Sequence, residues 1–272
     1  MMRLLRLVPG LGAVGLLCAL AACGGETPKA AYIEKPVDDL YNKAMDQLVD
    51  EDYTVASKTF GDVESQHPYS VWATKSQLME AFSEYEDGNY DEAILSANRF
   101  ITLHPGNRDT AYAYYLKALC YYIQITDVGR DQKITDEALR ALEEVVRRFP
   151  DSKYARDAKL KLDFTRDHLA GKEMAIGRWY LGQQEYLAAI NRFKRVVDNF
   201  QTTTHVPEAL ERIVECDLAL GLAAEAKKNA SVLGYNYPGS HWYSDAYQLV
   251  TNTGNPGDNG PSWISRAWRD MF

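Results

Sequence analysis

A repeat of five similar segments runs through most of this chain and restricts the folds that it can adopt. The segments align on the dipeptide at their ends, and an alanine stands twelve residues before the second residue of each dipeptide. The dipeptides are His67-Pro68, His104-Pro105, Phe149-Pro150, Phe200-Gln201 and Tyr237-Pro238, and the alanines are Ala56, Ala93, Ala138, Ala189 and Ala226. Self-similarity of this kind predicts stacked copies of one supersecondary unit.

Two further positions of each segment are apolar, at eight and at five residues before the same reference point. They are Phe60, Ala97, Leu142, Phe193 and Ala230, followed by Val63, Phe100, Val145, Val196 and Leu233. These offsets place the apolar side chains on one face of a helix, with alanine where two helices approach closely. The terminal proline then ends the helix.

A second helical pattern precedes each of these helices, so the unit is a pair of helices. The copies are spaced by 37, 45, 51 and 37 residues, and the excess falls on a polar loop at Thr126–Thr135 and on a further helix at Tyr154–Ala170. The pattern resembles the tetratricopeptide repeat. We therefore predict an all-α solenoid of about five helix-turn-helix repeats, with ten to twelve helices over residues 37–250. The alternative is a set of independent helical hairpins packed as a globule.

Residues 1–22 have the order of a secretory signal: Arg3 and Arg6, an apolar run from Leu7 to Leu20, and two small residues. Leu20-Ala21-Ala22-Cys23 also resembles the lipobox of bacterial lipoproteins, which implies cleavage before Cys23 and its acylation. Residues 23–36 would then be a lipidated tether, with Gly24 favouring the outer membrane. The alternative is an ordinary signal followed by a chance cysteine.

Charge and cysteine content exclude several classes of function. The mature chain would carry 28 Lys and Arg against 38 Asp and Glu, a net charge of −10. An acidic chain of this kind has no broad surface for nucleic acid, which requires clustered basic residues. Cys120 and Cys216 lie two repeats apart, and we expect both to be buried and unpaired.

No pattern in the sequence indicates catalysis, a metal site or a cofactor. His67 and His104 occupy the repeat position that elsewhere holds an aromatic residue, which predicts a packing role. His168, His205 and His241 have no neighbour at ligand spacing. No phosphate-binding glycine loop or nucleophile elbow occurs. The chain is therefore not expected to be an enzyme.

Protein binding is indicated instead by aromatic and apolar side chains on the first helix of each pair. Tyr41, Met45, Phe82 and Tyr85 would line a groove suited to an extended peptide, together with Leu48 and Leu78. The alternative is that these residues form core between repeats. The third repeat adds five tyrosines, more than one core face can hold, and some of them are expected to face a partner: Tyr112, Tyr114, Tyr115, Tyr121 and Tyr122.

The C-terminus differs from the repeats. Residues 251–261 have the composition of a flexible linker, and Ser262–Phe272 is a short segment of amphipathic pattern that contains Trp263 and Trp268. Eleven residues are too few for a stable isolated helix. This tail is expected to bind a partner through its tryptophans, or else to cap the last repeat.

Lipobox and repeats together resemble the BamD family, the tetratricopeptide lipoproteins of the outer-membrane β-barrel assembly (BAM) complex. The more specific matches are His67–Ser70, Phe149–Tyr154, Asp163–Ala170 and Ala188–Arg192. The resemblance implies an outer-membrane lipoprotein facing the periplasm, which binds periplasmic domains of the barrel subunit BamA and other BAM subunits. It also implies that the N-terminal repeats receive unfolded outer-membrane β-barrel proteins.

Within this resemblance, Arg192 aligns with an arginine that contacts BamA in the family, and Asn191 beside it is expected to belong to the same partner-binding site. A guanidinium can pair bidentately with a carboxylate, which suits Arg192 to this role. The alternative for Arg192 is a solvated charge beside Lys194 and Arg195. The alternative for the whole chain is a periplasmic peptide-binding or coordination scaffold in cell division or pilus assembly.

Overall fold

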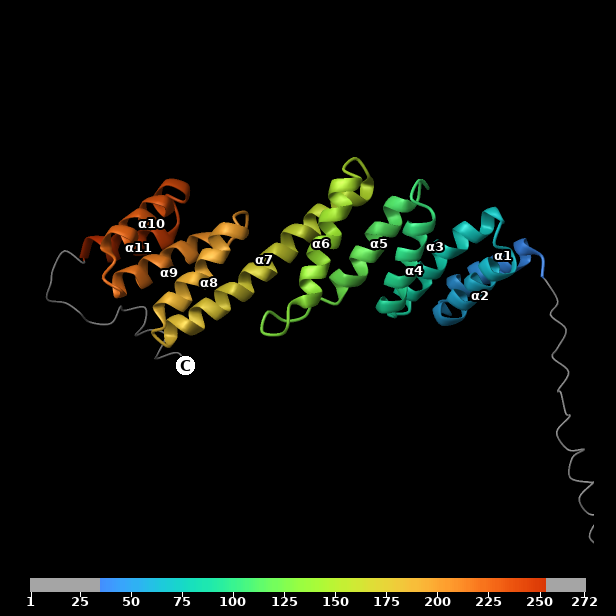
Figure 1. The fold of residues 1–272 in the computed structure, drawn as a ribbon, viewed down its shortest axis with the longest axis horizontal. Helices are drawn as coiled ribbons and strands as arrows, with labels where there is room; N and C mark the ends of the chain where they lie inside the picture. The colour runs from blue at the N-terminus through green and yellow to red at the C-terminus, as the bar shows by residue number, and fades with distance from the viewer. Residues whose placement is uncertain (1–34, 253–272) are drawn as a thin grey trace, which may run out of the picture. The chain divides into compact units, whose positions relative to one another are not determined.

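The computed structural model describes residues 35–252, and every regular element in this part of the chain is an α-helix. Residues 37–252 belong to one compact unit. The helices are α1 Val37–Val49, α2 Tyr53–Gln66, α3 Val71–Glu86, α4 Tyr90–Leu103, α5 Thr110–Ile123, α6 Lys133–Arg148, α7 Lys153–Gly182, α8 Tyr186–Asn199, α9 Val206–Ala219, α10 Ala223–Asn236 and α11 His241–Asn252. Each helix packs against the next one along the chain (Figure 1). The predicted all-α tetratricopeptide-repeat solenoid is confirmed, with eleven helices in the described part.

The repeat positions found in the sequence form the core. All five alanines are fully buried, and the ten apolar residues at the other two repeat positions are at most 7% exposed. The second helix of each pair therefore presents the same three positions to its neighbours.

The ends of these five helices also share one geometry. His67, His104, Phe149, Phe200 and Tyr237 are all helix-capping residues, and the backbone N–H of each donates to the carbonyl four residues earlier. The two histidines thus lie where the other copies have an aromatic residue. This confirms that His67 and His104 occupy a structural position of the repeat.

Serine marks the start of two of the first helices. The hydroxyl of Ser70 accepts a hydrogen bond from the N–H of Ala73 at 3.0 Å, and that of Ser152 accepts one from the N–H of Ala155 at 3.1 Å. An N-cap of this kind satisfies one of the backbone donors that a helix start leaves unpaired. The two caps fix where α3 and α7 begin.

The additional helix predicted at Tyr154–Ala170 is not a separate element. It continues without a break into the first helix of the fourth pair, so that α7 spans 30 residues. Gly177 does not interrupt it, and a Cβ at that position would lie 2.5 Å from the Phe193 ring of α8. Glycine is needed there because α7 and α8 approach so closely.

The tyrosines of α5 are half-buried, and several pack against other aromatic rings. Tyr115 stacks on Tyr154 with 5.3 Å between ring centroids, and Tyr112 lies 5.4 Å from the same ring. Cys120 and Cys216 are buried and unpaired, as expected, and burial raises the pKa of the Cys120 thiol to about 12. Among the described helices, none is long and apolar enough to cross a membrane.

Candidate partner-binding surface on α7, α8 and α9

Arg192 lies on α8 and faces the neighbouring helix α7. Its Nη1 atom donates to Glu173 Oε2 at 3.1 Å, and Arg195 Nη1 lies 3.4 Å from the other oxygen of the same carboxylate. Glu173 is shielded, with a side chain that is 18% exposed, while those of Arg192 and Arg195 are 29% and 57% exposed. One carboxylate therefore faces two guanidinium groups, which leaves a net positive charge at this point of the surface. Asn191 is exposed beside it.

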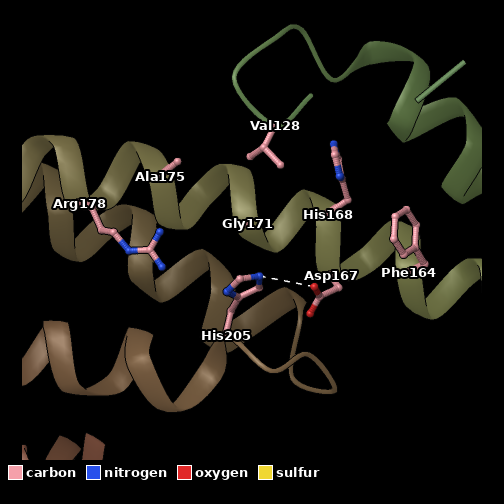
Figure 2. A pocket seen from close by; sticks show the side chains of 8 residues that line it. All are labelled: Val128, Phe164, Asp167, His168, Gly171, Ala175, Arg178 and His205. Atoms are coloured by element: carbon pink, nitrogen blue, oxygen red, sulfur yellow. Dashed lines mark ion pairs between the residues drawn. The ribbon is translucent and has the colours of Figure 1, made fainter. Parts of the chain in front are cut away.

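A pocket of about 310 Å³ opens along another face of α7. Figure 2 shows Val128 of the α5–α6 loop above α7 and His205 below it, beside the start of α9. The α7 residues that line it recur at intervals of three or four, as one helix face requires: Phe164, Asp167, His168, Gly171, Ala175 and Arg178. The pocket is thus built from three segments that are distant in sequence.

Hydrogen bonds and ion pairs hold one side of this pocket in place. Asp167 accepts from the hydroxyl of Thr204 at 3.1 Å, and its other oxygen lies 3.6 Å from His205 Nε2 (Figure 2). Arg178 pairs with Glu208 through two hydrogen bonds, of 2.8 and 2.6 Å. These contacts join the middle of α7 to the start of α9.

The other side of the pocket is apolar and partly open. Phe164 is 56% exposed and stacks on His168 at 6.3 Å between ring centroids. The Nε2 atom of His168 is buried and has no hydrogen-bond partner. A pocket with an aromatic wall and a few polar groups suits a side chain of a protein partner. Within residues 35–252, no group of three or more His, Cys, Asp or Glu side chains could hold a metal ion.

The predicted groove residues of α1 and α3 are partly buried. Tyr41 lies 5.7 Å from the Phe60 ring and 4.5 Å from that of Trp72, and Met45 packs on the same cluster. Phe82 and Tyr85 pack on the buried cluster that contains Ala81, Ala97 and Leu116. Each of these side chains therefore contributes to the core and keeps some exposed surface. Cys23, Trp263 and Trp268 lie outside the described residues.

The pocket could not be identified from the sequence. The spacing of its α7 residues was visible there, but nothing showed that Val128 and His205 would meet that helix. In the sequence, His168 and His205 have no other potential ligand at the spacing that a metal site would need. In the structure, the groups that surround them come from segments that are distant in the sequence.

Comparison with known proteins extends over nearly the whole chain. The profile of the YfiO family, described as an outer membrane lipoprotein, matches residues 33–233. An outer membrane protein assembly factor BamD from Caulobacter vibrioides is 51% identical over 246 residues, which cover 90% of this chain and 81% of that protein. A BamD from Rickettsia prowazekii is 47% identical, and the match covers 93% of this chain and 100% of that protein.

A more distant relative has the same name. BamD from a serogroup A strain of Neisseria meningitidis is 35% identical, and the match covers 86% of this chain and 93% of that protein. Similarity at this level, over the repeats and beyond them, shows that this chain belongs to the BamD family of outer membrane lipoproteins that serve as outer membrane protein assembly factors.

Proposed function

We propose that this chain is a scaffold of the β-barrel assembly machinery, anchored in the outer membrane through acylated Cys23 and facing the periplasm. The observation that carries the proposal is the 51% identity to an outer membrane protein assembly factor over 90% of the chain. The structure supports a binding role, because its candidate site offers a partly open pocket and paired charges on adjacent helices. Several acyl chains on one cysteine would anchor it stably.

BamA is the proposed partner of the α7–α8 surface. Arg192 and Arg195 share one shielded carboxylate, so the pair retains a positive charge that an acidic group of BamA can approach. An arginine that is held in place by Glu173 loses less side-chain freedom on binding than a mobile one. Asn191 adds an exposed amide at the same point.

Co-purification tests this proposal. The full chain is purified in mild detergent, and the BamA that accompanies it is quantified for the wild type and for Arg192→Glu. We expect Arg192→Glu to reduce the recovered BamA by about tenfold or more, because reversing a charge in a hydrogen-bonded interfacial pair costs about 2–5 kcal/mol. Lys194→Glu is the matched control, since it makes the same charge change at a nearby exposed residue of the same helix.

Glu173→Gln separates two roles for Arg192. If Arg192 contacts BamA, the Gln variant leaves the guanidinium available and reduces the recovered BamA much less than Arg192→Glu does. If Arg192 only holds α8 to α7, both variants lose BamA to the same degree. Recovery of division or pilus components in place of BamA with the wild-type chain would contradict the assembly function itself.

The N-terminal repeats are the proposed site for unfolded barrel proteins. Tyr41, Met45, Phe82 and Tyr85 leave part of their apolar surface uncovered on α1 and α3. Aromatic side chains that are partly fixed by their own core can contact an extended peptide at little entropic cost. This groove is far along the chain from Arg192, so substrate and BamA would use different repeats.

A further inference from the structure

Helix α11 covers the charged face of α9. Every residue of α9 from Ala209 to Asp217 is buried, although four of them are charged. An ordinary surface helix has a solvated polar face. Here α8 and α10 pack on α9 from within the repeat, and α11 packs on it as well.

Glu211 lies beneath α11 and lacks hydrogen-bond partners. Its side chain is fully buried, and neither carboxylate oxygen has a hydrogen-bond partner. Glu211 forms an ion pair with Arg212, whose Nε atom lies 3.5 Å from its carboxylate. The same guanidinium also pairs with the carboxylates of Glu215, at 2.9 Å, and Glu208, at 3.8 Å. One arginine thus faces three carboxylates, of which Glu208 is also paired with Arg178, and Asp245 of α11 adds a further negative charge near Glu211. A buried acceptor without a donor destabilises the arrangement that contains it.

The contacts of α11 with α9 and α10 involve three of its residues. The ring of Trp242 lies 5.5 Å from the Arg212 guanidinium carbon, and Ala246 is fully buried. Tyr243 packs so closely on α10 that a Cβ at Gly234 would lie 2.5 Å from its ring. The surface of α9 and α10 that α11 covers, here called its seat, is thus contacted by Trp242, by Tyr243 next to it, and by Ala246 four positions after the tryptophan.

The C-terminal tail repeats this pattern after the linker. Gly239-Ser-His-Trp-Tyr-Ser-Asp-Ala-Tyr247 aligns with Gly260-Pro-Ser-Trp-Ile-Ser-Arg-Ala-Trp268, and four of the nine positions are identical. Trp263 corresponds to Trp242, and Ala267 corresponds to Ala246. The informative difference is at Asp245, where the tail has Arg266.

From this alignment we infer that the tail, residues 262–272, is a second docking segment for the seat of α11 on α9, and that it competes with α11 for this seat. Trp263 takes the place of Trp242 over Arg212, and Arg266 brings to Glu211 the donor that Asp245 cannot supply. The exchange replaces the Asp245 carboxylate near Glu211 with a guanidinium donor, which favours the charged form of Glu211 and lets it accept a charge-assisted hydrogen bond. It does not depend on the identity of any assembly partner.

The chain is long enough for the exchange. If α11 leaves its seat, the segment from Tyr237 to Ser262 connects α10 to the tail, and fully extended it would reach about 80 Å. A helix is only about 10 Å in diameter, so the tail can reach α9 of its own chain. The seat then has two possible occupants of similar sequence and opposite charge at one position.

Photocrosslinking in the full chain tests the inference. Benzoylphenylalanine replaces Trp263, which keeps an aromatic side chain at that position, and the irradiated protein is digested and analysed by mass spectrometry. We expect crosslinks within one chain, to the α9 segment around Arg212. Crosslinks between chains only, crosslinks that never include α9, or an absence of crosslinks would each overturn the inference.

Substitutions at charged positions of the tail and of α11 test the proposed pairing. Arg266→Asp should lower the yield of the α9 crosslink by about tenfold, the factor expected for loss of one charge-assisted hydrogen bond. The matched control is Arg269→Asp, which aligns with the exposed Gln248 and should leave the yield unchanged. Asp245→Arg should lower the yield too, because it gives α11 the same donor. Equal loss in Arg266→Asp and Arg269→Asp would overturn the pairing with Glu211.

Discussion

The two ends of the repeat array are built differently. In the α1–α5 part, the core consists of small clusters, such as Ala44, Ala56 and Phe60, or Ala93, Ile94 and Cys120. From the second half of α7 to α11, one cluster of 16 buried residues joins five helices. The buried apolar side chains of the N-terminal pairs thus fall into separate clusters, while the C-terminal pairs share one core.

This difference suits two kinds of binding. Tyr41 and Tyr85 stay partly uncovered beside the separate clusters, and we expect the helices that carry them to open more independently than those of the shared core. A shared core holds Arg192, Glu173 and the pocket in fixed positions. This difference agrees with the proposed function, in which the N-terminal repeats receive unfolded barrel proteins and the C-terminal repeats bind BamA.

The largest expected effect comes from removing a ring of the shared core. Phe193 is fully buried, and Phe193→Ala should lower the free energy of unfolding by about 3–5 kcal/mol. Because its neighbours belong to one cluster, protection from hydrogen exchange should fall across α7–α11 together. Phe60→Ala, at an equally buried position of α2, is the matched variant, and its loss of protection should stay within α1–α3. Uniform loss along the whole chain in both variants would remove the distinction between the two ends.

An intermediate effect is expected from the buried carboxylate of α9. Burial, followed by the neighbouring carboxylates and against the opposing charge of Arg212, raises the pKa of Glu211 from its ordinary 4.5 to about 8. The folded chain therefore keeps a proton that the unfolded chain has lost between pH 4.5 and 8, so stability falls as pH rises through that window. Glu211→Gln should abolish this slope and stabilise the protein by about 1–3 kcal/mol above pH 8. Urea denaturation at pH 5 and pH 8.5 measures both quantities.

Glu80 offers the same comparison at the N-terminal end. Burial, with Glu84 and Glu64 nearby, raises the pKa of Glu80 to about 7. Its side chain is only partly buried, so Glu80→Gln should produce the same sign with a smaller amplitude. A larger effect at Glu80 than at Glu211 would contradict our account of the α9 cluster.

The smallest effect should come from the two serine caps. Ser70→Ala removes the cap hydrogen bond of α3. Ser152→Ala removes that of α7 and also the bond that the hydroxyl donates to the Phe149 carbonyl at 2.8 Å. Each variant should cost about 1 kcal/mol in thermal or urea unfolding. Ser152→Thr keeps an acceptor and should retain most of the stability. If Ser152→Ala costs no more than a surface change, the start of α7 is fixed by packing alone.

The sequence was sufficient to predict the repeat because its signal lies in single positions that recur. Alanines such as Ala56 and Ala189 could be assigned to the core from spacing alone, and the structure buries them. The merging of Tyr154–Ala170 into one 30-residue helix was not predicted, because a continuous helix and two helices joined by a short turn have the same periodicity.

The pocket and the α9 cluster were not predictable in the same way. Asp167 and His205 are far apart in the sequence and meet only because α7 and the start of α9 come together. Glu208, Glu211 and Glu215 follow a helical spacing that normally indicates a solvated face. Only the position of α11 shows that this face is covered.

The continuity of α7 has a mechanical consequence. Its 30 residues form a rod of about 45 Å, with every turn clamped by backbone hydrogen bonds. A bend or twist between the N-terminal and C-terminal repeats must break some of those bonds, whereas a loop would yield at no such cost. A force applied to either end of the repeat array is therefore transmitted along the continuous helix α7, because no flexible loop lies there to absorb it.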